Sequence, residues 1–275
     1  METPADPGGR APGVPLVGTY SGRLILAVVI YVAWLAETLL LGNGISRAPS
    51  LSPLDWAVPV VVAGIFIGCI VSALFLKTSM ARGMVSPGQA GLDPGRKTIP
   101  ALLITGIAGG ILLAVVPFAH ITVSDPLGTM LFLFPLAAGE VMVCWALLAT
   151  HIESFLLIRG SRGPVALAGL LAAALASSLP YLTGMLPGEG FSFATLVILA
   201  GIGTGFVFLV FRDIYATLLF RLVLLAILTG ISGTAAWGGI SLLFALPLAL
   251  AAAVILVAAG AAFSRWYGEG KPQGA

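Results

Sequence analysis

Eight long runs of apolar residues, separated by short polar or Gly- and Pro-rich segments, set the strongest constraint on how this chain can fold. A helix that crosses the hydrocarbon core of a bilayer, about 30 Å thick, needs about 20 mostly apolar residues at a rise of about 1.5 Å each. Stretches such as LLITGIAGGILLAVV are continuously apolar and lack the alternation that the strand of a membrane barrel requires. The sequence therefore predicts an all-α, polytopic transmembrane helical bundle of about eight spans, at residues 24–41, 56–76, 99–121, 127–150, 165–186, 191–211, 214–232 and 237–263.

Composition excludes a soluble fold. Hydrophobic residues make up 59% of the 275 residues and charged residues only 9%, whereas an ordinary soluble domain carries about 25% charged residues. The formal net charge is +2 and the basic residues are spread along the chain, so the sequence offers no basic patch for nucleic acid. The expected partners are the lipid bilayer and either other membrane proteins or a second copy of the chain.

The distribution of Lys and Arg predicts the orientation, because short cytoplasmic loops carry an excess of these residues. Loops rich in Lys and Arg alternate along the chain with loops that hold Arg47 and otherwise neutral or acidic residues, such as Asp55 and Asp125. This alternation favours an even number of spans in a cytoplasmic (plasma) membrane, with the N- and C-termini both cytoplasmic. The residues assigned to the cytoplasmic side are Arg10, Arg23, Lys77, Arg82, Arg96, Lys97, Arg159, Arg162, Arg212, Arg265 and Lys271.

The domain organisation follows from the same pattern. Residues 1–22 are polar and rich in Pro and Gly, which is typical of a disordered tail, and residues 265–275 read as a second cytoplasmic tail. Residues 23–264 form a single transmembrane domain, whose longest cytoplasmic loop, about 77–97, is expected to be a plain linker. Small-residue pairs, such as Gly64 with Gly68 and Gly201 with Gly205, are expected to let helices approach closely.

Charged residues inside the spans are rare, and each costs about 2.5 to 3.5 kcal/mol on insertion scales. Glu140 lies about 20 Å below the outer surface and Arg221 about 12 Å above the inner surface, at about 1.5 Å per residue. In a core about 30 Å thick these depths nearly coincide. We hypothesise that Glu140 and Arg221 form a buried pair, because a lone buried charge is costlier than a paired one. The sequence leaves open whether the pair only fixes helix register or also forms a proton or substrate site.

Three further ionisable residues are candidates near the ends of spans. Glu37 lies near the outer end of the first span, where its side chain can reach the interface. His151 and Glu153 follow the fourth span, whose apolar run continues without a helix breaker through HIESFLLIR. Cys144 and His151 lie about 10 Å apart along a helix axis, too far to share a zinc ion at ligand distances of about 2.0 to 2.3 Å. No metal site and no cofactor are expected.

The second half of the chain resembles a known family of membrane proteins. The segments PLAAGEVMVCWALLAT, RGSRG, ALAGLLAAALASSLPYL and GIGTGFVFLVFRDIYATLLFRLVLL follow one another as they do in the CAAX protease and bacteriocin-processing (CPBP) family. The resemblance implies a bundle of eight or so helices with an intramembrane glutamate protease core. Glu140 would match the second glutamate of the family motif Glu-Glu-x-x-x-Arg, in which Gly139 and Cys144 replace the other two residues.

The other family motifs are not kept. The Phe-x-x-x-His motif would fall on Ser177 and Tyr181, and the helix that holds Arg221 lacks the histidine that begins the third motif. These losses remove groups that would activate water and stabilise an oxyanion, so the resemblance implies a catalytically silent relative. We therefore expect a non-catalytic subunit or scaffold of a membrane protein assembly. The alternatives are a transporter or ion-coupling protein that uses Glu140 and Arg221, and an intramembrane protease.

Overall fold

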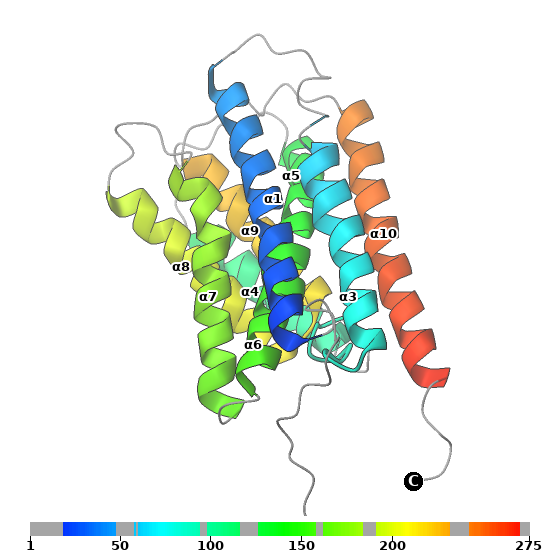
Figure 1. Cartoon of the computed structure of the whole chain (residues 1–275). Helices are drawn as coiled ribbons and strands as arrows, with labels where there is room; N and C mark the ends of the chain where they lie inside the picture. Colours follow the sequence, from blue (N-terminus) through cyan, green and yellow to red (C-terminus); the bar gives the residue numbers. More distant parts are fainter. Residues whose placement is uncertain are drawn as a thin grey trace, which may run out of the picture.

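The computed structural model describes residues 19–47, 58, 60–93, 98–115, 126–157, 162–183, 191–231 and 242–269. These residues form eight helical rods and no strand (Figure 1), and each rod occupies one of the predicted apolar runs, which confirms the all-α prediction. The elements are α1 (Tyr20–Arg47), η2 (Val60–Val71) continuing into α3 (Ser72–Ala81), α4 (Thr98–Val115), α5 (Pro126–Glu140) continuing through η3 (Val141–Ala149) into α6 (Thr150–Leu157), α7 (Arg162–Thr183), α8 (Phe191–Phe211), α9 (Ile214–Ile231) and α10 (Leu242–Glu269).

Length and hydropathy make several of the rods candidate membrane helices. Among the described residues, five helices are long and apolar enough to cross a bilayer, and three shorter apolar helices accompany them. Inside hydrocarbon every backbone N–H and C=O must be paired within the protein, which a helix achieves and an irregular segment does not. The five candidate spans are Tyr20–Leu40, Val60–Ala81, Leu133–Leu157, Pro164–Leu182 and Ala194–Phe211, and the shorter helices are Thr98–Leu112, Ile214–Leu228 and Leu246–Ala262.

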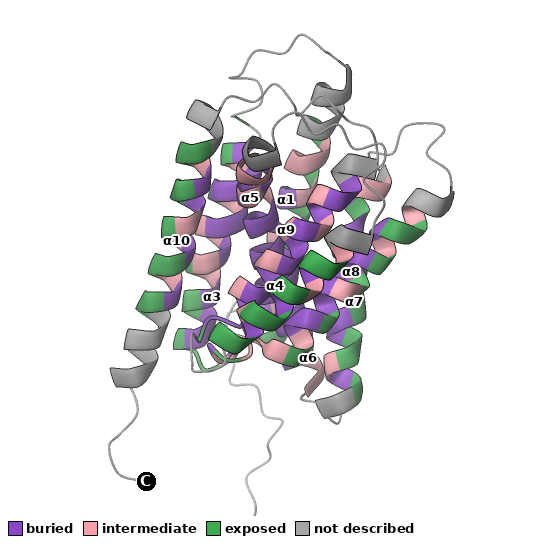
Figure 2. Ribbon diagram, turned by 180° about the vertical axis from the view of Figure 1, so that it is seen from behind, coloured by how far each residue is buried: buried purple, intermediate pink, exposed green. Residues whose placement is uncertain are grey.

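The rod formed by α5, η3 and α6 is the centre of the bundle. All residues of Val141–Ala149 are buried, and α1, η2, α7, α9 and α10 pack around this rod. Figure 2 shows the resulting buried interior, with exposed residues on the outer helices. A helix that is apolar on all sides belongs in such a core. The winding widens in η2 and η3, each of which is a π-helix.

Glycines allow η2 to approach the central rod at backbone distance. A Cβ atom placed on Gly139 would lie 2.7 Å from the carbonyl oxygen of Gly64, closer than real Cβ atoms come. A Cβ placed on Gly201 would lie 2.7 Å from the carbonyl oxygen of Ala174, so α8 approaches α7 in the same way. The prediction that small residues let helices pack closely is therefore confirmed at both glycine pairs.

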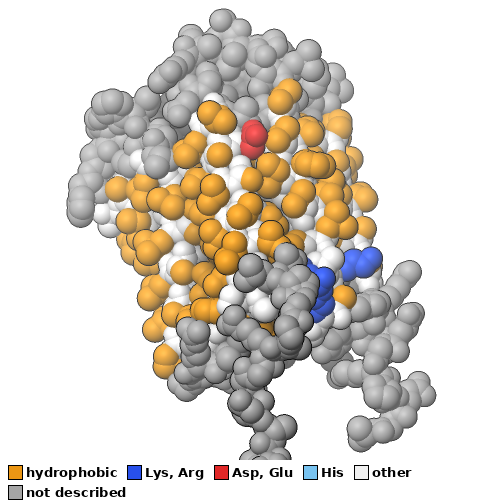
Figure 3. Space-filling model, viewed as in Figure 1, with side chains coloured by type: hydrophobic (Ala, Val, Ile, Leu, Met, Phe, Trp, Pro, Cys, Tyr) orange, Lys and Arg blue, Asp and Glu red, His pale blue; other side chains and the backbone are white. Residues whose placement is uncertain are grey.

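The outer surface of the bundle is apolar. Ile99 is 71% exposed, Val254 65% and Leu103 62%, and orange hydrophobic side chains cover the face shown in Figure 3. Water would make such a surface costly, whereas lipid chains accept it. The bundle is thus built to sit in a membrane.

The ends of the transmembrane domain differ in part from the expected ones. α1 begins at Tyr20, inside the expected 1–22 tail, and α10 continues to Glu269, past the expected end of the domain at 264. Residues 1–18 and 270–275, which make up most of the two expected tails, lie outside the described residues. The loop expected at 77–97 begins only after Ala81, because α3 continues to that residue.

The described part of this loop, residues 82–93, is packed against the bundle and is no plain linker. Val85, Ala90 and Leu92 are all buried, and the backbone N–H of Ile214 donates to the carbonyl oxygen of Gly91 at 3.0 Å. Gly91 itself has a φ of +70°, which glycine adopts without strain. The loop thereby covers the end of the bundle where α8 joins α9.

Candidate functional site

The core of the bundle holds two opposite charges in contact. Glu140 ends α5 on the central rod, and Arg221 lies on α9, which packs against that rod. Nη2 of Arg221 lies 2.6 Å from Oε1 of Glu140, and the two side chains are 0% and 1% exposed. The structure thus brings together the two residues that the sequence placed at similar depth. Each charge offsets the desolvation of the other, which a buried single charge could not avoid.

Tyr181 of α7 completes this cluster. Its hydroxyl donates to Oε2 of Glu140 at 2.9 Å, and its ring lies under the guanidinium of Arg221, with 5.2 Å from Cζ to the ring centroid. The first contact is a hydrogen bond to a charged acceptor, and the second is a cation–π interaction. The polar core formed by Glu140, Tyr181 and Arg221 therefore joins the central rod, α7 and α9.

The polar core keeps unused hydrogen-bonding capacity. The 2.6 Å contact joins Nη2 of Arg221 to Oε1 of Glu140, but it leaves other N–H groups of the guanidinium without a partner among the described residues. Nε and Nη1 of Arg221 have no hydrogen-bond partner there. A buried donor without an acceptor costs about 1–3 kcal/mol, more for charged groups. These N–H groups are therefore the donors that a further acceptor would contact.

Glu37 lies apart from the polar core. It is partly exposed on α1 and forms no ion pair with the described residues. A glutamate near the end of a span can keep its carboxylate in the interface without a partner. The structure thus separates Glu37 from the Glu140–Arg221 pair.

His151 is buried at the joint between α6 and α3. Its Nδ1 lies 2.8 Å from the carbonyl oxygen of Leu147, and its Nε2 lies 2.9 Å from Oγ of Ser79. Because a carbonyl only accepts, Nδ1 carries the proton, and Nε2 accepts from the Ser79 hydroxyl. Nε2 thereby joins α6 to α3, whereas Nδ1 is bonded within its own rod.

Glu153 belongs to a second polar cluster. Its Oε2 accepts from Nη1 of Arg212 at 2.8 Å, and the same Nη1 lies 3.2 Å from the carbonyl oxygen of Gln89. Arg212 adopts a φ of +48° in the short link between α8 and α9, and its guanidinium stacks 5.4 Å from the centroid of Phe208. The Arg212 cluster, formed by Gln89, Glu153 and Arg212, thus joins the loop 82–93, α6 and the α8–α9 link.

Asp213, next to this cluster, starts α9. Its Oδ1 accepts from the backbone N–H groups of Tyr215 and Ala216, both at 2.9 Å. Its Oδ2 accepts from the hydroxyl of Thr98, the first residue of α4, at 2.6 Å. A carboxylate in this position satisfies free N–H groups of the first helical turn. Asp213 thereby fixes α4 and α9 to each other at their adjoining ends.

Sequence reasoning missed three of these roles. Tyr181 entered only as the position of a family histidine, because a neutral tyrosine carries no insertion cost that would mark it. The sequence indicates Arg212 only as one of the basic residues that predict the orientation of the spans, and it does not mark Asp213 as a candidate site residue. The Asp213 role had a usable signal, since an Asp directly before the apolar run of α9 is typical of a helix N-cap.

The described residues offer no metal site, as no three of their His, Cys, Asp and Glu side chains gather in a group able to hold an ion. Comparisons with protein-family models, with curated proteins and with solved structures find no match to this chain.

Proposed function

We propose that this chain is an eight-span, non-catalytic subunit or scaffold of a membrane protein assembly. The observation that carries the proposal is the closed polar core. Arg221 and Glu140 are 0% and 1% exposed, and they and Tyr181 contact one another across three parts of the bundle. A transported ion or a substrate needs a path to such groups, whereas a structural cross-link functions best when closed. The polar core therefore supports an architectural role.

The arrangement of basic residues supports two termini on one side of the membrane, which we propose to be the plasma membrane. The start of α1 and the end of α10 lie at the same end of the bundle (Figure 1). Arg23 donates to the hydroxyl of Thr78 at 2.7 Å, Arg82 directly follows α3, and Arg212 contacts Gln89, so these arginines gather at that end. By the excess of Lys and Arg in cytoplasmic loops, this end is the cytoplasmic one.

The glycines that remain exposed indicate where a partner helix would pack. Gly64, Gly68, Gly201 and Gly205 are all used for contacts within the chain. On α4, by contrast, Gly106 and Gly110 are exposed, and a Cβ placed on Gly110 would meet nothing within 4 Å. Outward glycines four residues apart allow close helix packing in a membrane. They support contact between α4 and a helix of another membrane protein.

Purification from the native host in mild detergent tests the subunit proposal. The proposal is supported if other proteins co-purify with the full chain in fixed stoichiometry and no longer co-purify with the Gly110→Ile variant. Ala258→Ile is the matched control, since Ala258 is exposed on α10 instead of α4. A monodisperse chain without partners would contradict the proposal.

The N–H groups of Arg221 that have no partner among the described residues favour one second candidate function, that of a transporter or ion-coupling protein. A buried guanidinium with free donors next to a carboxylate can bind a polar solute or exchange a proton through bound water. Uptake by the full chain in liposomes, abolished by Glu140→Gln in a variant that still purifies as a folded particle, would favour transport over the scaffold.

The CPBP resemblance is a further part of the proposal. We infer a degenerate relative in which Tyr181 stands where the family motif has its histidine. Tyr181 already donates to Glu140, and Arg221 neutralises the same carboxylate, so neither oxygen is free to activate a water molecule. Incubation of the purified chain with membrane-spanning peptides tests this part, because cleavage that Glu140→Gln abolishes would restore the intramembrane protease.

A further inference from the structure

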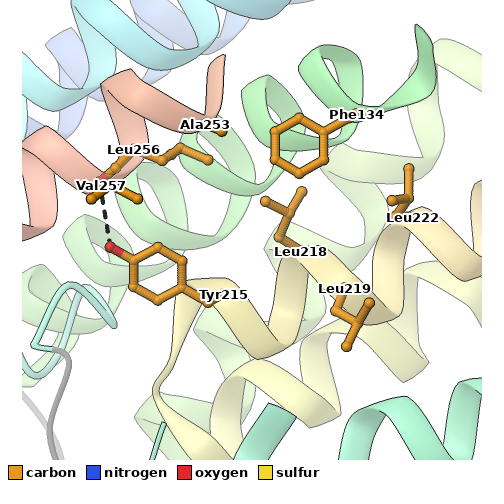
Figure 4. A pocket seen from close by; sticks show the side chains of 8 residues that line it. All are labelled: Phe134, Tyr215, Leu218, Leu219, Leu222, Ala253, Leu256 and Val257. Atoms are coloured by element: carbon orange, nitrogen blue, oxygen red, sulfur yellow. Dashed lines mark hydrogen bonds between the residues drawn. The ribbon is translucent and has the colours of Figure 1, made fainter. Parts of the chain in front are cut away.

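A groove of about 200 Å³ opens between α9 and α10 on the side of the bundle away from α7. Leu218 and Leu222 of α9 form one wall, Ala253 and Leu256 of α10 form the other, and Phe134 of α5 lies between them (Figure 4). Arg221 lies on the same helix as Leu218 and Leu222 but points into the core, so the groove is separate from the polar core.

The lining of the groove offers no free polar group. Tyr215 is its one residue with a polar side-chain atom, and that hydroxyl donates to the carbonyl oxygen of Leu256 at 3.4 Å. This hydrogen bond bridges α9 and α10 at one end of the groove, as the dashed line in Figure 4 shows. A water molecule needs 2–4 polar partners, which this lining does not supply. The groove therefore suits an apolar occupant.

The groove is continuous with the lipid-facing surface of the bundle. Leu250, Val254 and Val257 beside it on α10 are all more than half exposed and apolar. Val257 is itself part of the lining, together with Ala253 and Phe134, so the groove opens onto this exposed face. Whatever surrounds α10 in the membrane therefore has direct access to the groove.

We propose that the groove binds one acyl chain of a membrane phospholipid. Hydrocarbon matches the lining, and it is the medium in contact with the mouth of the groove. With a volume of about 200 Å³, the groove has room for a short stretch of hydrocarbon chain and not for a whole lipid. The rest of the lipid lies along α10. This site needs only that the bundle spans a membrane, and it is independent of the role of the polar core.

Photo-cross-linking tests the site. The full chain is placed in nanodiscs with a phospholipid that carries a diazirine on its acyl chain, and the labelled peptides are mapped. Ala253→Trp fills the groove and should lose most of the cross-links to Leu218, Leu222 and Leu256. Ala251→Trp adds the same ring on the exposed face of α10 and should keep them.

Leu219→Trp fills the groove from α9 and replaces Ala253→Trp if that variant does not fold. Native mass spectrometry after extensive detergent washing gives a second measurement, in which wild type retains a phospholipid that the filled variants lose. Three outcomes would each overturn the proposal. The first is equal labelling of the groove and of the exposed face of α4, and the second is labelling that stays unchanged in the filled variants. The third is cross-linking to a second copy of the chain at this site.

Discussion

At the residue scale, the Glu140–Arg221 pair shows why buried charges in a membrane come in partners. Removing one partner leaves a charge with 0% or 1% exposure and no counterion. We predict that Glu140→Gln and Arg221→Met each lower the free energy of unfolding by about 3–5 kcal/mol. The double variant should lose clearly less free energy of unfolding than the two single variants lose together, because it buries no charge. Unfolding in detergent mixtures measures this, and strict additivity would contradict the pairing.

Tyr181 gives a second prediction at this scale. Tyr181→Phe keeps the ring beneath Arg221 but removes the hydroxyl that donates to Oε2 of Glu140 at 2.9 Å. A hydrogen bond to a charged group contributes about 1.5–3 kcal/mol, so the free energy of unfolding should fall by about that amount. Tyr20→Phe, at an exposed position of α1, is the control and should change nothing measurable. Equal effects of the two substitutions would count against the described contact.

At the element scale, the position and type of the helices were predictable from hydropathy alone, because each apolar run is long enough to need a helix in lipid. The Glu140–Arg221 contact was predictable as well, since depth along two antiparallel helices follows from residue counts. The burial of Val85 and Leu92 in the loop was not, because it depends on tertiary packing, such as the hydrogen bond between Ile214 and Gly91, that no local pattern encodes. The same holds for the central place of η3 among equally apolar helices.

The contact between η2 and the central rod yields a prediction about packing. Gly139→Ala places a methyl group against the backbone of Gly64, where neither helix can retreat without moving its neighbours. Overpacking of this kind costs about 1–3 kcal/mol or more. Gly110→Ala is the matched control, since nothing lies within 4 Å of the added Cβ and alanine favours the helix. Thermal unfolding in detergent should show a lower midpoint for Gly139→Ala only.

At the scale of the whole molecule, the polar core and the Arg212 cluster have different places and roles. The polar core lies inside the bundle and joins helices side by side, whereas the Arg212 cluster and Asp213 join a loop and helix ends at one end. Around the polar core, the outer faces of the described rods expose apolar side chains, as a surface in contact with lipid requires. The bundle is therefore held laterally by one cluster and closed at one end by the other.

The side on which that closed end lies can be tested with a single cysteine. Gly88 is exposed in the loop 82–93, and nothing lies within 4 Å of an added Cβ, so Gly88→Cys should fold normally. The native Cys69 and Cys144 are buried, so wild type should give little background. Because the arginines around this loop indicate the cytoplasmic side, a membrane-impermeant maleimide should label Gly88→Cys in inside-out vesicles and not in intact cells. Labelling in intact cells would reverse the proposed orientation, together with the side assigned to both termini.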